Sequence, residues 1–167
     1  MSEYRITDGS SFKQAMAAIQ EKLNTKVERI HSNVYREMVN CGVDCLSASV
    51  PRAPVESGYL RSSGYVTTNG EKVAKGAEDG SVSKHESAAP EWERLQVEVG
   101  FSAPYAHRQH EDLNMRHDRT DGYRRSDGTT VNMVAGGQAK YLESVVVENI
   151  DSWKQRVAEA AKRGLSE

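Results

Sequence analysis

The feature that most constrains the fold of this chain is an apolar stripe that recurs every three or four residues through its first 45 positions. Such spacing places the side chains on one face of a helix, close to the heptad repeat of a coiled coil. Pro51 and Pro54 are expected to end the helix, so we predict a helix over about residues 12–49. The stripe consists of Phe12, Met16, Ile19, Leu23, Val27, Ile30, Val34, Met38, Cys41 and Cys45.

A helix of this extent is roughly 55 Å long at about 1.5 Å per residue. The whole chain has 167 residues, which is one domain's worth of length with one moderate core. A single small core does not cover so long a helix. Part of the stripe is therefore expected to pack on a neighbouring chain.

Composition agrees with a folded protein that has a thin core. Leu, Ile, Val and Phe together number 30 of the 167 residues, but the formal net charge is only -2, and disordered chains combine low hydrophobicity with high net charge. With 22 basic and 24 acidic residues, a basic nucleic-acid binder is not expected. The sequence has no apolar run of about 18 residues, so no membrane-spanning helix is expected. Residues 1–10 lack the apolar stretch of a secretory signal.

The remaining pattern predicts an α+β fold in a single domain, with two helices packed on a small antiparallel sheet. The sheet region spans about residues 59–116, with strands at 64–68 and at 95–101, where apolar and polar residues alternate. Residues 69–91 and 117–137 are predicted to be two long loops or hairpin arms. A C-terminal helix is predicted over about residues 138–163, with Gly164 as its C-cap and an apolar stripe of Leu142, Val146, Ile150, Trp153 and Val157.

The strongest candidate for catalytic chemistry is the cluster around His107, His110 and Glu111, with His117 beyond it. A zincin helix carries His-Glu-x-x-His, in which two imidazoles one turn apart bind zinc beside the Glu. Counted from His110, the second histidine falls at position 114, which is Asn114. Structural or interface roles are therefore favoured, and a metal-dependent hydrolase that uses this cluster stays an alternative.

Two other segments invite an anion-binding interpretation. Residues 136–140 read Gly-Gly-Gln-Ala-Lys; they lack the spacing of a phosphate loop, although two glycines before a helix can bind an anion. We interpret them as a flexible start of the last helix. Arg124 and Arg125 could contact phosphate or an acidic neighbour, and a solvated loop tip is the simpler interpretation.

Three short motifs together resemble a known family. Residues 53–63 read Ala-Pro-Val-Glu-Ser-Gly-Tyr-Leu-Arg-Ser-Ser, residues 104–111 read Pro-Tyr-Ala-His-Arg-Gln-His-Glu, and residues 136–143 read Gly-Gly-Gln-Ala-Lys-Tyr-Leu-Glu. In this order, and after a long helix, they resemble the signatures of the neck or tail-completion proteins of tailed bacteriophages, also labelled head–tail connector, minor capsid or minor tail components. Glu56 and Ser57 replace the family's usual Asp-Thr.

The motif residues fit structural roles. The order Glu-Ser-Gly in the first motif is turn chemistry, so Gly58 is expected to have a positive φ, and Arg61 is expected to pair with a carboxylate and fix how the first helix meets the sheet. The second motif is expected to hold the segment after the second strand, and the third to start the last helix. The structural residues of the first motif are Pro54, Glu56, Ser57, Gly58, Leu60 and Arg61. Those of the second motif are Tyr105, Ala106, His110 and Glu111, and those of the third are Gly136, Gly137, Gln138, Lys140 and Leu142.

The resemblance implies a virion structural protein with no enzymatic activity and no cofactor. It implies a ring of six or twelve copies that joins the portal-side connector, adaptor or stopper to the tail terminator or tail tube and lets DNA pass. Near-neutral charge suits such a passage, because strong phosphate binding would retard the DNA. Ile30, Val34, Arg124 and Arg125 are candidate interface residues. A helical adaptor protein of the host is a third hypothesis.

Overall fold

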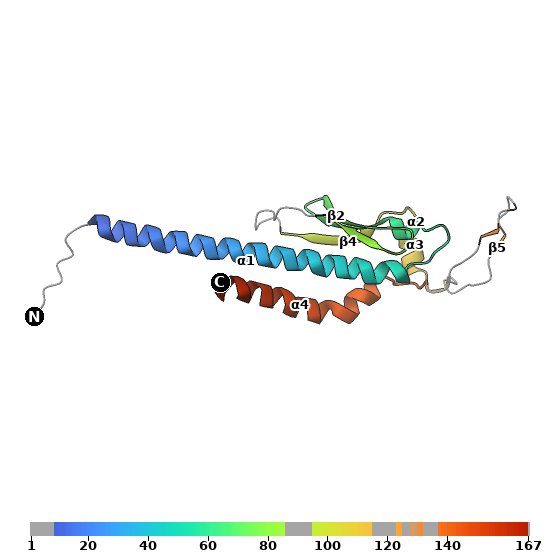
Figure 1. Ribbon diagram of the computed structural model, residues 1–167. Helices are drawn as coiled ribbons and strands as arrows, with labels where there is room; N and C mark the ends of the chain where they lie inside the picture. Colours follow the sequence, from blue (N-terminus) through green and yellow to red (C-terminus); the bar gives the residue numbers. More distant parts are fainter. Residues whose placement is uncertain are drawn as a thin grey trace, which may run out of the picture.

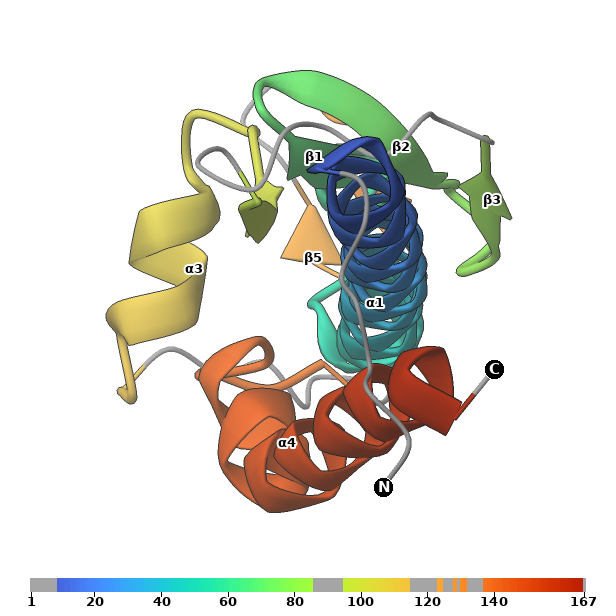
Figure 2. The same cartoon turned by 90° about the vertical axis from the view of Figure 1, so that its left-hand side faces the viewer.

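The computed structural model describes residues 9–85, 95–114, 123–124, 128, 130–131 and 137–166. A long first helix lies between a sheet and a second long helix (Figures 1 and 2), and the predicted α+β class is confirmed. The helices are α1 (Gly9–Arg52), α2 (Tyr59–Ser62), α3 (Ala106–Glu111) and α4 (Glu143–Ser166). The strands are β1 (Gly64–Thr68), β2 (Glu71–Gly76), β3 (Val82–Lys84), β4 (Val97–Phe101), β5 (Tyr123–Arg124) and β6 (Thr130–Val131).

The main sheet has four antiparallel strands in the order β3-β2-β1-β4. Strand β1 is central, and its Val66 faces Ala74 of β2 on one side and Val99 of β4 on the other. The two strands at 64–68 and 95–101 are thus confirmed, and β4 is an edge strand among the described strands. One face of this sheet packs on α1.

Of the two alternatives predicted for residues 69–91, a long exposed loop or a hairpin arm, strands β2 and β3 show a hairpin, and it belongs to the main sheet. Val73 and Ala74 of β2 are completely buried in the core, and only residues 86–91 of that segment lie outside the described residues. Asn69 and Gly70 join β1 to β2 with φ angles of 50° and 82°, as a tight hairpin turn requires. The Asn-Gly pair is therefore a sequence signal for this hairpin.

The core lies between α1 and the sheet. Helix α1 lies close to the sheet at Gly42, where an added Cβ would lie 2.9 Å from Cγ1 of Val97 and 3.0 Å from Cγ1 of Val66. Each fully buried aliphatic side chain of the core stabilises the fold by about 1.5–3 kcal/mol. The cluster consists of Tyr35, Val39, Leu46, Val50, Val66, Val73 and Ala74.

Helix α4 runs antiparallel to α1 along the face opposite the sheet. At one end, both terminal nitrogens of Arg52 donate to the carboxylate of Glu148, at 2.8 and 2.7 Å. In the middle, Arg156 donates to Glu37 at 2.7 Å and to Asp44 at 2.6 Å. These ion pairs fix the register of the two helices.

The ends of α4 differ from the prediction. The helix begins at Glu143 rather than at 138, because residues 139–142 form a turn. Gly164 is not a C-cap: it lies inside the helix, where an added Cβ would come within 2.7 Å of the Ile30 Cα. Lys26 Nζ donates to the Leu165 carbonyl at 2.8 Å. Helix α4 therefore ends beside residues 26–30, and α1 continues beyond it (Figure 1).

The second predicted loop, residues 117–137, is described only in part. Strands β5 and β6 pair antiparallel, with Tyr123 facing Val131 and Arg124 facing Thr130. The side chain of Arg124, and Arg125, Gly136 and His117 entirely, lie outside the described residues. The interface role of the two arginines stays a prediction.

Candidate functional site

The first motif forms a turn at the end of α1. Gly58 has a φ of 78° and precedes α2, so the predicted positive φ is confirmed. An added Cβ there would lie 2.8 Å from Cβ of Glu78. Ser57 Oγ accepts a hydrogen bond from the Tyr59 amide at 3.4 Å. The turn therefore needs glycine both for its backbone conformation and for its close approach to a neighbour.

Among the described residues, Arg61 pairs with no carboxylate, so that prediction is wrong. Its Nη2 donates to the carbonyl of Pro51 at 3.0 Å, and its Nε donates to the carbonyl of Ala53 at 3.4 Å. The last carbonyls of a helix lack intrahelical partners and carry partial negative charge. Arg61 thus satisfies the C-terminal end of α1, and burial lowers the pKa of its guanidinium.

The second and third motifs meet at Tyr141, which is 1% exposed. Its hydroxyl donates to the carbonyl of Ala106 at 3.2 Å, and its ring packs edge-on against His110 and Phe101 with centroids 4.9 Å away. Burial raises the pKa of the Tyr141 phenol to about 12. Tyr141, Ala106 and Leu60 belong to a second small core, against which Phe101 packs.

The third motif also touches the first. The Gln138 amide donates to the carbonyl of Arg52 at 2.9 Å, and an added Cβ at Gly137 would lie 2.6 Å from the Pro54 Cα. Pro54, Glu56, Ser57 and Leu60 line a small cavity with Tyr105. All three motifs, separated by up to about 80 residues of sequence, therefore converge at one end of the molecule. We call this cluster the motif junction.

An ion-pair group forms the outer part of the motif junction. Lys140 has a φ of 54°, and its amide donates to the His110 carbonyl at 2.8 Å. Its ammonium contacts Glu111 and lies 2.8 Å from the carboxylate of Glu143. The hydrogen bonds from Lys140 and then His110 lower the pKa of the Glu111 carboxyl to about 2.

His110 is held by two contacts that define its tautomer. The Glu143 amide donates to Nε2 at 3.3 Å, and Nδ1 lies 2.7 Å from the Glu111 carboxylate. An imidazole whose Nε2 accepts must carry its proton on Nδ1 when neutral. His110 thus acts as a cap for the first turn of α4, which agrees with the structural role expected for it.

His110, Glu111 and Glu143 offer ligand atoms within 4.8 Å of one another, the geometry of a possible metal site. The Lys140 ammonium already contacts both carboxylates and supplies the positive charge there. His107 instead lines a cavity of about 190 Å³ with His110 and Tyr141. The geometry favours an ion-pair cluster over a catalytic metal centre.

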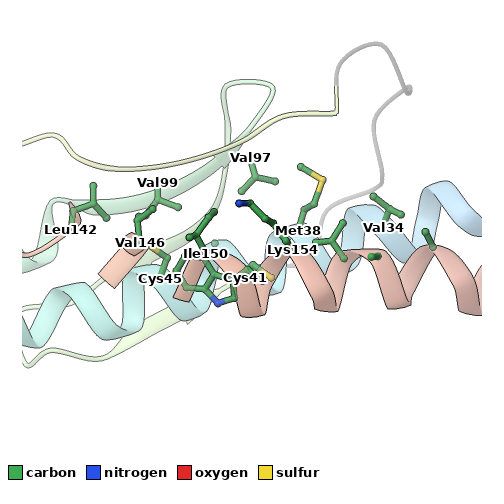
Figure 3. A pocket seen from close by; sticks show the side chains of 15 residues that line it. Val34, Met38, Cys41, Cys45, Val97, Val99, Leu142, Val146, Ile150 and Lys154 are labelled. Atoms are coloured by element: carbon green, nitrogen blue, oxygen red, sulfur yellow. The ribbon is translucent and has the colours of Figure 1, made fainter. Parts of the chain in front are cut away.

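An apolar groove runs between β4 and α4, over one face of α1 (Figure 3). Its volume is about 680 Å³. The side chains of Val97, Val99, Val146 and Ile150 point into it from its two sides. The lining consists of Val34, Met38, Cys41, Gly42, Cys45, Val97, Val99, Leu142, Val146, Ile150, Trp153, Lys154, Val157, Ala158 and Ala161.

The two cysteines act as apolar residues of this groove. Both thiols are free and buried, and burial raises the pKa of Cys45 to about 11 and also raises that of Cys41. A raised pKa keeps the reactive thiolate scarce at neutral pH. The groove therefore offers a surface for apolar contact rather than a nucleophile.

Beyond the end of α4, the stripe of α1 is exposed. Phe12 is 66% exposed and Leu23 is 58% exposed; Met16, Ile19 and Val27 are about half exposed. Val34, by contrast, is 9% exposed, and Ile30 lies against Gly164 of α4. Ile30 thus packs on the chain's own α4, Val34 lines the groove, and the uncovered stripe lies at residues 12–27. The interface role of Ile30 and Val34 stays a prediction.

Comparisons with protein-family models, curated proteins and solved structures find no match. Among the described residues, no helix is long and apolar enough to cross a bilayer.

Proposed function

We propose that the chain is a structural component of a bacteriophage virion at the head–tail junction, a neck or tail-completion protein without enzymatic activity. It assembles as a ring of six or twelve copies that joins the portal-side connector, adaptor or stopper to the tail terminator or tail tube. It is made in the cytoplasm of the bacterial host and lets DNA pass through the neck.

The convergence of the three motifs is the observation that supports this proposal. Arg61 binds the end of α1, Tyr141 binds Ala106, and Lys140 binds Glu111. The motif residues on which the resemblance rests thus contact one another or the end of α1. Such contacts are expected if the three motifs stabilise one common fold. Their contacts hold secondary-structure ends together, which is a structural rather than a catalytic use of these side chains.

The exposed stripe supports assembly. Five large apolar side chains along one helix face are exposed by 49–66%, and a contiguous exposed apolar patch is typical of a protein–protein interface. The balance of 22 basic and 24 acidic residues suits a wall past which DNA moves without strong phosphate binding.

The experiment is a deletion of the gene in the phage that carries it, combined with mass spectrometry of purified wild-type particles. The proposal predicts DNA-filled heads and separate tails in the mutant lysate, restored to complete particles by the gene in trans. It also predicts six or twelve copies per wild-type particle. Complete, infectious particles from the deletion mutant would contradict it.

A further inference from the structure

We propose that the exposed stripe of one copy, Phe12 to Val27, docks in the apolar groove of the next copy, between its β4 and α4. The occupant of the groove is thus a second copy of this chain. The inference rests on the proposed function for the closure of these contacts into a ring. The length and charge of the two surfaces support the contact itself.

The lengths of the two surfaces match. The stripe from Phe12 to Val27 spans about 23 Å, and the α4 residues of the groove, from Val146 to Ala161, also span about 23 Å, both at about 1.5 Å per residue. The stripe is narrow, as in a coiled-coil seam. An amphipathic helix docks in an apolar groove through such a row of anchors.

The charges beside the two surfaces are opposite in sign. Residues 11–29 hold four basic and two acidic side chains. The segments beside the groove, residues 95–101 and 142–161, hold five acidic side chains against the basic Lys154 and Arg156, which is a net charge of −3. Within the same chain, Glu143 pairs with Lys140, Glu148 with Arg52 and Asp151 with Lys154. Opposite charge at the rim favours docking in one orientation and discourages other pairings.

A chain does not fill its own groove with its own stripe. Both surfaces include α1, which is one continuous helix from Gly9 to Arg52, and the stripe projects past the end of α4 (Figure 1). The contact therefore joins different surfaces of two copies. Such heterologous contacts repeat from copy to copy and close into a ring when the rotation allows it.

Antiparallel pairing of two stripes is the competing arrangement. If Phe12 of one copy faced Val27 of another, Lys13 would face Lys26, which places like charges side by side. That arrangement would also leave both grooves uncovered. The groove is therefore the better partner for the stripe.

The experiment uses the purified full chain and two variants, with sedimentation velocity and mass photometry as readouts. Met16→Asp/Leu23→Asp alters the stripe, and Ile150→Arg alters the groove. Wild type is expected to associate at micromolar concentration. Each variant alone is expected to associate at least about 100-fold more weakly, because each places charge in an apolar contact.

Mixing the two variants separates the two arrangements. The stripe variant keeps an intact groove and the groove variant keeps an intact stripe, so a mixture has one working contact. We expect a 1:1 dimer that does not grow further. Stripe pairing predicts instead that the groove variant associates by itself as well as wild type does.

Matched controls carry the same charges on neighbouring surfaces. Gln14→Asp/Thr25→Asp lies on the opposite side of α1, by about 100° per residue, and Val147→Arg lies on α4 at a position that is 71% exposed. Both are expected to associate like wild type. Thermal unfolding by circular dichroism checks that all four variants fold.

Four results would overturn the inference: a monomeric wild type at high micromolar concentration, undiminished association of either interface variant, loss of association in the controls, or a mixture that forms no dimer. A chain that associates as described but is absent from particles would refute the proposed function and keep this contact. A chain that is present in the neck but associates through another surface would refute this contact and keep the proposed function.

Discussion

The two halves of α1 carry the same apolar stripe but have different surroundings. In residues 30–52, a second apolar row of Tyr35, Val39, Leu46 and Val50 packs on the sheet, while the stripe itself faces α4 and the groove. In residues 11–29, none of the positions that continue the second row carries a large apolar side chain; they are Gln14, Ala17, Glu21, Asn24 and Glu28. An apolar stripe thus shows which face of a helix will be covered. A second apolar row shows where the cover comes from the same chain rather than from a partner.

The largest expected difference between the two halves of α1 concerns two valines of the stripe. Val34 is 9% exposed and Val27 is 49% exposed, and they lie two turns apart. Val34→Asp should destabilise the fold by about 3–5 kcal/mol, because it places an uncompensated carboxylate among apolar side chains. Val27→Asp should change the free energy of unfolding by less than about 0.5 kcal/mol. Urea denaturation of dilute protein measures both, and equal losses would refute the distinction between the halves.

Two leucines give a milder version of the same test. Leu46 is fully buried against the sheet, whereas Leu23 is 58% exposed. Leu46→Ala should cost about 2–5 kcal/mol through lost burial and the cavity left behind. Leu23→Ala should leave the unfolding of dilute protein nearly unchanged while weakening self-association. A stable Leu46→Ala variant would show that the sheet does not cover this half as described.

Substitutions at two glycines test the packing of the motif junction, which lies at the C-terminal end of α1. Gly58 and Gly70 have φ angles of 78° and 82°, so alanine strains the backbone at both by about 1–2 kcal/mol. Only at Gly58 does the new Cβ meet a neighbour, Glu78. Gly58→Ala should therefore cost about 1–3 kcal/mol more than Gly70→Ala. Equal decreases in the melting temperatures of the two variants would show that contact with Glu78 adds no cost at Gly58.

The smallest expected effect concerns pH. The pKa of the Glu111 carboxyl is about 2 in the folded chain, below its ordinary value of 4.5, chiefly because of Lys140. A depressed pKa adds stability that is present above about pH 4.5 and is lost as the pH falls toward 2. Lys140→Met should raise the Glu111 pKa toward its ordinary value, measured by NMR titration of the side-chain carboxyl carbon. An unchanged pKa would show that Lys140 is not its main partner.

Much of the fold follows from local sequence patterns. The stripe predicted α1 to within about three residues at each end, alternation predicted β4, and turn chemistry predicted the positive φ of Gly58. The strand β1 was also predicted, from its position after the turn-rich motif. Strands β2 and β3 were missed because few apolar residues alternate in them, although Asn69 and Gly70 mark the hairpin.

The contacts of the candidate site were less predictable, because they join segments far apart in the sequence. Arg61 was expected to bind a carboxylate, since local spacing does not reveal that the carbonyl end of α1 lies beside it. Lys140 was expected only to start a helix, and its place between Glu111 and Glu143 depends on how α3 meets α4. Gly164 resembles a helix cap in sequence, whereas its function is to let α4 approach Ile30.

The central claim, that residues 12–27 are uncovered in one copy and covered by the next, is tested most directly by hydrogen–deuterium exchange at several protein concentrations. At low concentration, amides of residues 12–27 should exchange far faster than those of residues 34–50, because few buried contacts hold the free half. At high concentration, residues 12–27 and the groove segment 146–157 should gain protection together. Equal, concentration-independent protection of both halves of α1 would contradict the account.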